Sequence, residues 1–302
     1  MRVVAALGGN ALLRRGEPMT VAVQRQNARR AAAALAPLAR THDLVVTHGN
    51  GPQVGLLALQ AELDPGHGPV PFDLLGAETE GAIGYVLEQE LGNALPGREL
   101  ATILTRTVVD AADPALQAPT KFVGQGYEDE EAQRLADERG WQMRRDGDRM
   151  RRVVGSPEPR EIVELPAIRL LVDAGMLVIC AGGGGVPVTR SPDGLAGIEA
   201  VVDKDLTAAL LAEELEADLL LLLTDVEGVL VDGRPVELAG PEALRAFGLP
   251  AGSMGPKAEA AARFVERTGG HAAIGSLEAA SELALGLAGT QVATGAPLPA
   301  GA

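Results

Sequence analysis

Residues 3–12 read VVAALGGNAL, an apolar run that ends directly in a glycine-rich turn. The pattern returns three times along the chain, each time as an apolar run that leads into a turn and then into helix-like sequence. These further runs are Asp43–Thr47, Met176–Cys180 and Leu219–Leu223. Strand, turn and helix in repeated succession are typical of an α/β protein with a mostly parallel sheet. We therefore expect four strands whose carboxyl ends share one edge of that sheet.

Chain length and local composition predict the domain organisation. At 302 residues the chain is at the upper limit of one hydrophobic core, so we expect a single domain with lobes at about 1–175 and about 176–302. The segment Phe122–Pro166 holds most of the crowded charge and is expected to protrude as a small subdomain. The sequence leaves open whether this subdomain is a lid or only a surface insertion. The last ten residues are expected to form a frayed tail.

Composition argues against several classes of function. The net charge of −15 disfavours a nucleic acid or an anionic membrane surface as the main partner. The single cysteine, Cys180, can form neither an internal disulfide nor a cysteine-built metal site, which favours a reducing cytoplasm. The N-terminus lacks the apolar stretch of a signal peptide, and the run Leu219–Leu223 is far too short to cross a membrane.

Lysine is rare in this chain, because the 26 basic residues include only Lys121, Lys204 and Lys257. Arginine therefore supplies the general surface charge, and each lysine is predicted to lie where a compact ammonium group is needed. The alternative is that these three lysines are present by chance. Lys204 and Lys257 fall in the first turns of the expected helices Leu206–Leu215 and Ala258–Glu266. A cation there opposes the helix dipole, so a bound anion is the expected compensation.

The glycine turns point to the same anion. Glycine between a strand and a helix lets backbone N–H groups approach a phosphate closely. One such turn also has a purely conformational explanation, but four at one sheet edge favour a polyanion site. Lys121 lies where the core gives way to the charged segment, so we place it at a lid hinge. Asp203 precedes Lys204 and is a preferred N-cap residue, which would explain it without any catalytic task.

Several common catalytic motifs are missing from the sequence. It contains neither a Walker A motif nor, after the first strand, a Gly-x-Gly-x-x-Gly fingerprint, which disfavours P-loop NTPases and Rossmann dehydrogenases. It has no Gly-x-Ser-x-Gly elbow, and its four histidines suggest no zinc triad. For His48, beside the second glycine turn, a turn-stabilising hydrogen bond is favoured over contact with substrate.

Eight segments in order resemble the carbamate kinases, a branch of the amino acid kinase family. They are VVAALGGNAL (3–12), THGNGPQVGLL (47–57), PTKFVG (119–124), RRVVGSPEP (151–159), CAGGGGVPV (180–188), EAVVDKDL (199–206), LLTDVEGV (222–229) and GSMGPK (252–257). The resemblance implies an open αβα sandwich with an N-terminal lobe for carbamate or carbamoyl phosphate and a C-terminal lobe for ATP or ADP. It also implies a lid subdomain, Mg²⁺ held mainly by the nucleotide phosphates, a cytoplasmic homodimer and a role in arginine metabolism.

The resemblance further implies roles for individual residues. The catalytic set is Lys121, Lys204 and Lys257 as phosphate-contacting cations, with Asp203 as their organiser. The substrate and the transferring phosphate would be held by Gly8, Gly9, Asn10, Gly49, Asn50 and Gly51. The nucleotide would be held by Asp225, Met254 and Lys257. In this family pattern no residue is a direct metal ligand.

The sequence also departs from the pattern it resembles. Ala6 stands where many amino acid kinases carry a lysine, and Lys121 is the candidate replacement. Gln125 and Gly155 are expected to loosen the lid. Glu80 stands in place of a common glutamine and would add an unpaired acid near the subunit interface or the substrate pocket, whereas an exposed position would make it harmless. Two alternatives stay open: a kinase of this fold that acts on another small acid, and a silent nucleotide-binding regulator.

Overall fold

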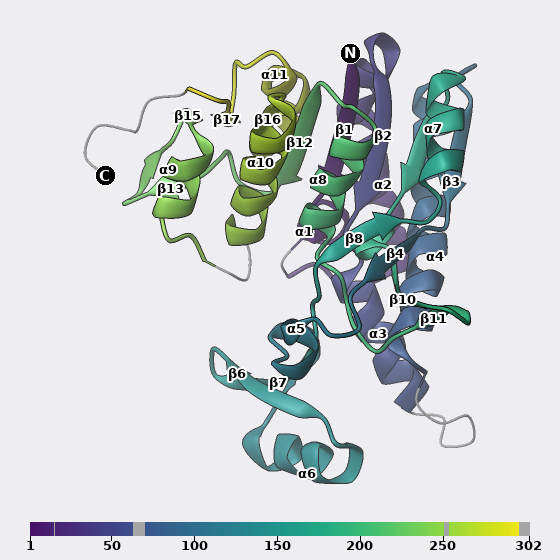
Figure 1. Ribbon diagram of the computed structural model, residues 1–302, viewed down its shortest axis with the longest axis vertical. Helices are drawn as coiled ribbons and strands as arrows, with labels where there is room; N and C mark the ends of the chain where they lie inside the picture. Colours follow the sequence, from purple (N-terminus) through teal and green to yellow (C-terminus); the bar gives the residue numbers. More distant parts are fainter. Residues whose placement is uncertain (15, 63–69, 251–253, 296–302) are drawn as a thin grey trace.

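A central sheet runs through the body of the molecule (Figure 1). The structure is a computed structural model that describes residues 1–14, 16–62, 70–250 and 254–295. Within these residues eight strands form the sheet, in the order β15-β17-β16-β12-β1-β2-β9-β3. Their bounds are β1 (Arg2–Leu7), β2 (Asp43–His48), β3 (Leu100–Ile103), β9 (Leu177–Cys180), β12 (Leu219–Thr224), β15 (Leu238–Ala239), β16 (His271–Ser276) and β17 (Thr290–Val292). Only the pairing of β16 with β17 is antiparallel among these described strands.

The four predicted strands are neighbours in this sheet, in the order β12, β1, β2 and β9. They pair in parallel, so their carboxyl ends lie at one edge, as the glycine turns predicted. Val3–Leu7 is fully buried along its length. A strand of a parallel sheet is covered on both faces, which is why these segments are continuous apolar runs and not alternating ones.

Helices cover both faces of the sheet, so the body has three layers (Figure 1). Along β1, Val3, Ala5 and Leu7 face one core, and Val4 and Ala6 face the other. The first core includes α2 (Val21–Thr41), α4 (Phe72–Ala94) and α11 (Ala280–Ala284). The second includes α7 (Leu165–Asp173), α8 (Lys204–Glu214), α9 (Pro241–Ala246) and α10 (Met254–Thr268). This arrangement is the predicted αβα sandwich.

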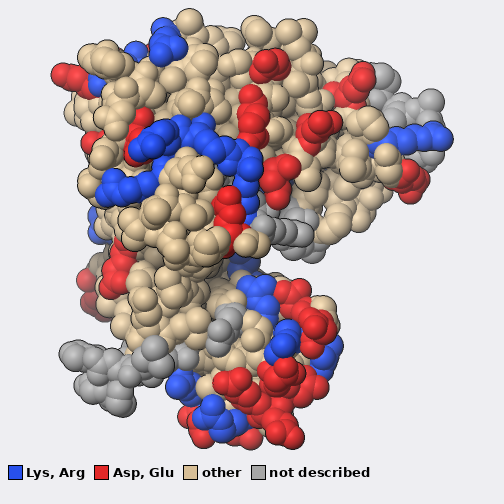
Figure 2. Space-filling view, turned by 180° about the vertical axis from the view of Figure 1, so that it is seen from behind, with Lys and Arg blue, Asp and Glu red and all other residues tan. Residues whose placement is uncertain are grey.

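A small subdomain projects from the body, but it is shorter than expected. It comprises β5 (Lys121–Tyr127), α6 (Asp129–Arg139), β6 (Gln142–Asp146) and β7 (Arg149–Val154), with strand order β5-β7-β6. We call residues 121–154 the projecting segment; Figure 2 shows acidic and basic side chains crowded over it. The expected end at Pro166 is wrong, because β8 (Pro159–Ile162) pairs with β4 (Arg106–Val109) on the body. Proline is tolerated at the start of an edge strand such as β8.

The boundary between the lobes also differs from the expected position near residue 176. Strand β9 lies between β2 and β3, inside the N-terminal part of the sheet. Strands β10 (Val186–Ser191) and β11 (Gly194–Gly197) join β4 and β8 in a second sheet. The C-terminal half therefore begins near α8, and the pairing of β1 with β12 joins the halves.

The remaining elements are short or lie at the edges of the body. They are α1 (Gly9–Leu12), α3 (Gly51–Glu62), α5 (Pro114–Gln117), β13 (Leu230–Val231), β14 (Arg234–Pro235), and the 3₁₀ turns η1 (Gly182–Gly184) and η2 (Leu277–Ala279). In the described part of the chain, no helix has both the length and the apolar character that a bilayer crossing needs. The expected C-terminal tail falls mostly on residues 296–302, outside the described residues.

Candidate active site

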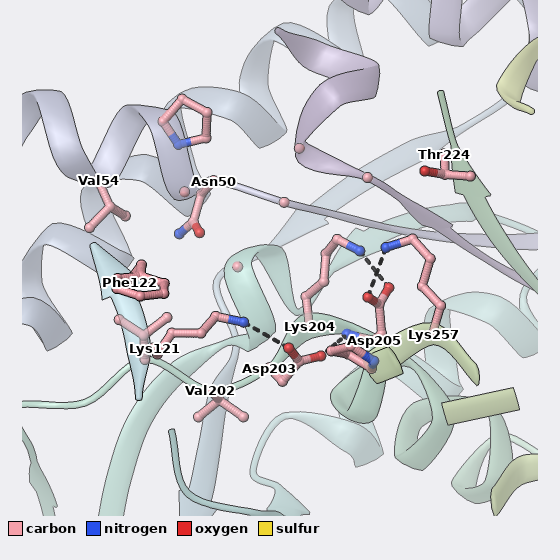
Figure 3. Close-up of a pocket in the computed structure, with 18 of the residues that line it drawn as sticks. Asn50, Val54, Lys121, Phe122, Val202, Asp203, Lys204, Asp205, Thr224 and Lys257 are labelled. Atoms are coloured by element: carbon pink, nitrogen blue, oxygen red, sulfur yellow. Dashed lines mark hydrogen bonds and ion pairs between the residues drawn. The ribbon is translucent and has the colours of Figure 1, made fainter. Parts of the chain in front are cut away.

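A cavity of about 500 Å³ opens at the carboxyl edge of the sheet (Figure 3). It brings together every candidate residue whose side chain the structure describes. These are Gly8, Gly9, Gly49, Asn50, Gly51, Lys121, Asp203, Lys204, Asp225, Met254 and Lys257. Asn10 belongs to α1, but its side chain lies outside the described part, as do residues 251–253 ahead of Met254. Residues from both halves of the chain and from the projecting segment thus share one cavity.

Two glycine turns pack directly against each other at this cavity. A Cβ atom on Gly49 would lie 2.8 Å from the backbone nitrogen of Gly9, so any larger residue would push the turns apart. The N–H of Gly8 donates to Leu223 O, and that of Gly49 donates to Leu7 O. These two N–H groups extend the sheet, so the backbone N–H groups left for a phosphate in these turns are the following ones, in the first turns of the helices.

Lys204 and Lys257 meet on one carboxylate at the N-terminus of α8. Lys204 Nζ lies 2.5 Å from Asp205 Oδ1, and Lys257 Nζ lies 3.1 Å from Asp205 Oδ2. Figure 3 shows the two ammonium groups converging on that carboxylate. Asp205 and Lys257 are buried, and the Lys204 side chain is 11% exposed. The expected compensation of these first-turn cations by a bound anion is therefore supplied in part by the protein itself.

Burial and pairing oppose each other in this cluster. Burial favours the neutral form of Asp205, but Lys204 and Lys257 outweigh it and lower the pKa of the carboxyl to about 2. For Lys204, burial lowers the pKa below its ordinary value, and neighbouring Lys257 adds to the effect while Asp205 opposes it. An additional anion near Lys204 would therefore be stabilising.

Lys121 enters the cavity from the projecting segment and pairs with Asp203. Lys121 Nζ donates to Asp203 Oδ2 at 2.7 Å, and Asp203 Oδ1 accepts from the backbone N–H of Asp205 at 2.9 Å. Burial acts to lower the pKa of Lys121, but Asp203 outweighs burial and raises it. Asp203 is thus the N-cap of α8 and the partner of one lysine. Of the three lysines, the structure gives Asp203 an ion pair with Lys121 alone, whereas Asp205 organises the other two.

Sequence reasoning missed Asp205. Its signal was weak, because an acid in the first turn of a helix is already explained by the helix dipole. Only the fold brings Lys257, 52 positions further along the chain, to the same carboxylate. The neighbouring pair Lys204 and Asp205 was visible in the sequence, but nothing in it marked the acid as a bridge.

His48 lies beneath the second glycine turn and is not among the described residues that line the cavity. It is fully buried, and its Nδ1 atom lies 3.2 Å from Gly49 O. Burial lowers its pKa to about 4, so the ring is neutral near neutral pH. This confirms the turn-stabilising interpretation of His48.

Glu80 is buried on α4, at 1% exposure, next to the third glycine turn. Its Oε1 atom accepts a hydrogen bond from Gly182 N at 2.9 Å, and burial raises its pKa to about 8. The adjacent Gly183 lines the cavity with a φ of 67°. A Cβ atom there would lie 2.1 Å from Asn50 Nδ2, so only glycine fits. The harmless exposed position considered for Glu80 is therefore excluded.

Comparison with known proteins assigns the chain to a family. A family model described as the amino acid kinase family matches residues 1–276. The chain belongs to the amino acid kinase family. Within the amino acid kinase family, it is 58% identical over 286 residues to a carbamate kinase of Rhizobium meliloti (strain 1021), covering 92% of this chain and 88% of that protein. These matches confirm the resemblance and the expectation of a phosphotransferase.

Solved structures agree with the sequence comparison. The structure of a Giardia lamblia carbamate kinase bound to citric acid superposes with a TM-score of 0.91 at 39% identity, covering 97% of this chain and 98% of that one. The same enzyme bound to AMP-PNP superposes with a TM-score of 0.89 at 38% identity, with the same coverage. The predicted α/β architecture of the amino acid kinase family is confirmed.

Proposed function

We propose that this chain is a carbamate kinase, which transfers a phosphoryl group reversibly between ATP and carbamate. Carbamoyl phosphate and ADP are then the other pair of substrates. The observation that carries the proposal is the convergence of Lys121, Lys204 and Lys257 at the edge where two glycine turns meet. Phosphoryl transfer depends on positioning and charge neutralisation, and these groups provide both.

The nature of the acceptor follows from the groups that surround it. A hydroxyl acceptor must lose a proton to a base, whereas a carbamate oxygen is already anionic. Asp203 and Asp205 are engaged by lysines, and neutral His48 holds a turn. These groups favour an acceptor that brings its own negative charge.

Each part of the cavity has a role in this proposal. Lys121 and the turn Gly49–Gly51 hold the carbamate end, and Lys204 neutralises the phosphoryl group in transfer. Asp225 directly follows β12, Met254 and Lys257 belong to the start of α10, and these three residues hold the nucleotide. The ability of the similar Giardia lamblia enzyme to bind AMP-PNP supports a nucleotide in this fold.

Magnesium enters the proposal with the nucleotide. Among the described residues, no group of three or more His, Cys, Asp or Glu side chains could hold a metal ion. The oxygens of Asp203 and Asp205 already accept from lysines and from helix N–H groups. We therefore assign Mg²⁺ to the nucleotide phosphates, where it would neutralise part of their charge.

The decisive measurement is ATP formation from ADP and carbamoyl phosphate by the purified protein. We expect rapid ATP formation, and in the reverse direction no comparable phosphorylation of acetylglutamate, glutamate or fosfomycin. A higher kcat/KM for one of those acceptors would support the other-acid alternative. Nucleotide binding without transfer to any of them would support the regulatory alternative.

We also propose that the projecting segment is a lid over the carbamate end of the cavity. Its first strand contributes Lys121, Phe122 and Val123 to the cavity wall. Replacing residues 128–148 with a short Gly-Ser link should raise the KM for carbamoyl phosphate far more than the KM for ADP. Equal increases in both would contradict a lid over the carbamate end.

A homodimer is the proposed assembly. Strand β3 is the edge of the main sheet, and a groove of about 450 Å³ runs between it and α4. Tyr85 lines this groove and is 57% exposed. Sedimentation equilibrium should give the mass of a dimer for wild type and of a monomer for Tyr85→Glu. A cytoplasmic setting and a role in arginine metabolism belong to the same proposal, and the buried free thiol of Cys180 supports the first.

A further inference from the structure

Arg152, in the RRVVGSPEP segment, joins the projecting segment to the body. Its guanidinium carbon lies 4.5 Å from the centre of the Trp141 ring, in the projecting segment, and 4.7 Å from the centre of the Phe72 ring, at the start of α4. The same guanidinium forms an ion pair with Glu199 at 2.9 Å. The Arg152 side chain is 18% exposed and that of Glu199 is 48% exposed, so the ring contacts are better shielded from water than the ion pair.

The partners of Arg152 on the body are themselves fixed. Phe72 is 2% exposed and packs in a cluster with Val54 and Leu75 of the body. The backbone N–H of Phe72 donates to Glu199 Oε2 at 2.9 Å, while Glu199 Oε1 faces Arg152. Arg152 is therefore held against a site on the body formed by the first turn of α4 and by Glu199, where the 199–203 loop begins.

That loop ends at Asp203, one of the carboxylates of the cavity, and leads directly into α8, which carries Asp205. From Glu199 the chain reaches Asp203 within four residues, and the backbone N–H of Val201 donates to Gly155 O at 3.0 Å. Gly155 directly follows β7, so the end of the projecting segment is tied to the loop through its backbone as well. Two contacts thus link the loop to β7 and its end: the Arg152–Glu199 ion pair and the backbone hydrogen bond between Val201 and Gly155.

The projecting segment also carries Lys121. In the pairing of β5 with β7, Lys121 lies opposite Val154, and Arg152 lies opposite Val123. Lys121 then reaches back to Asp203 on the same loop. A shift of β7 away from Glu199 would therefore carry Lys121 away from Asp203 and from the cavity.

We propose that Arg152 is a positioning residue for phosphoryl transfer, because its contacts with Phe72, Trp141 and Glu199 fix the projecting segment and thereby place the Lys121 ammonium. The catalytic consequence rests on the proposed function, whereas the contacts themselves do not. Arginine suits this position because a planar guanidinium can stack on two rings while it pairs with a carboxylate. A lysine ammonium cannot make both kinds of contact in that geometry.

The test compares Arg152→Met, Arg152→Lys and Arg145→Met in ATP formation from carbamoyl phosphate and ADP. Arg145 is the matched control, because it pairs with Asp129 inside the projecting segment. We expect both Arg152 variants to lose kcat by on the order of tenfold or more, with the KM for ADP within about twofold of wild type. Arg145→Met should keep the wild-type kcat. Far-ultraviolet circular dichroism and urea unfolding verify that each variant folds.

Trp141 provides a readout that is independent of activity, because it is the single tryptophan of the chain. Arg152→Met should shift its emission and increase its quenching by acrylamide, and Arg145→Met should change neither. Glu199→Gln should reduce kcat in the same direction, and the double variant with Arg152→Met should be no slower than the slower single variant. These results would support the proposal.

Two outcomes would overturn it. If Arg152→Met changes Trp141 fluorescence but leaves kcat unchanged, the contacts exist without positioning Lys121. If kcat falls equally in Arg145→Met, the effect belongs to the segment as a whole. A wild-type protein that forms no ATP would instead overturn the proposed function, and the catalytic role of Arg152 with it, while the fluorescence change would still report the contacts.

Discussion

Asp205 on the floor of the cavity and Glu80 beneath it are two buried carboxyl groups with opposite pKa shifts. They are 4% and 1% exposed, respectively. Two lysines lower the pKa of Asp205 to about 2, whereas burial raises that of Glu80, whose Oε1 accepts from a backbone N–H, to about 8. Burial disfavours the charged form at both sites, so the neighbouring cations decide the outcome. Whether a buried carboxyl group of this protein is charged therefore depends on whether a cation pairs with it.

The largest effect is expected when the Asp205 carboxylate is replaced. Asp205→Asn leaves the buried ammonium groups of Lys204 and Lys257 without their carboxylate. The free energy of unfolding should fall by about 3–5 kcal/mol, the usual cost of breaking a buried ion pair from one side. Urea denaturation near neutral pH measures it.

Asp203→Asn is the matched control for this change. Lys121, the partner of Asp203, is 37% exposed, so loss of that pair and of part of the helix cap should cost only about 1 kcal/mol. Added ADP should restore part of the stability of Asp205→Asn, because its phosphates replace some of the missing negative charge. Equal losses in the two variants would show that burial does not distinguish the pairs.

The next effect tests the cations instead of the carboxylate. Lys204→Ala should lower kcat by about two orders of magnitude or more, because a charge that stabilises the transferring phosphoryl is lost. The fold should survive, since Asp205 keeps Lys257. Lys204→Arg should not restore the rate, because a rigid guanidinium fork cannot replace a compact ammonium. A near-normal rate in the arginine variant would contradict the argument drawn from the rarity of lysine.

The sequence predicts much of this site because its signals do not depend on which segments meet in the fold. Glycine after an apolar run marks the carboxyl end of a parallel strand, so β1 and β2 could be placed before their neighbours were known. The scarcity of lysine singled out Lys121, Lys204 and Lys257, all of which line the cavity. The glycine signal lies within a few positions along the chain, and the lysine signal is a count over the whole sequence.

The parts that could not be predicted depend on contacts distant in sequence. Asp205 looks like an ordinary first-turn acid until α10 brings Lys257 to it. The end of the projecting segment was placed too late because only the pairing with β4, distant in sequence, shows that β8 belongs to the body. Arg152 likewise resembles any other arginine of a charged segment, and only the packing of α4 reveals its partners.

A smaller effect is expected at Lys257, which shares Asp205 with Lys204 and is proposed to contact the nucleotide. Lys257→Met removes one ammonium that would contact the nucleotide phosphates, so ADP binding should weaken by about 1–3 kcal/mol. Magnesium should reduce the loss, because it neutralises the same phosphates. Calorimetric titration of ADP with and without Mg²⁺ measures both values. Unchanged affinity in both titrations would place Lys257 outside the phosphate site and leave Lys121 and Lys204 as the catalytic cations.

The last prediction concerns Glu80, and the sign of its pH dependence follows from the raised pKa. Below the ordinary carboxyl pKa of 4.5, Glu80 is protonated in the folded and the unfolded chain. As the pH rises toward 8, the unfolded chain releases this proton first, so the folded state loses the corresponding stability. The contribution of Glu80 should therefore decline by about 1–1.5 kcal/mol per pH unit across this window. Asp205 behaves in the opposite way, since its contribution is lost only as the pH falls from 3.8 toward 2.

Glu80→Gln isolates this effect, because a glutamine oxygen can accept from Gly182 N and its amide, like the protonated acid, has a hydrogen to donate. The free energy of unfolding of wild type minus that of the variant should fall steadily with pH in urea titrations between about pH 5.5 and 7.5. His48, whose pKa is lowered to about 4, gains stability as the pH rises toward 6.5, but it is present in both proteins and cancels in the difference. A difference that stays constant with pH would mean that Glu80 is charged in the folded state, and that burial without a cation does not neutralise a carboxyl group here.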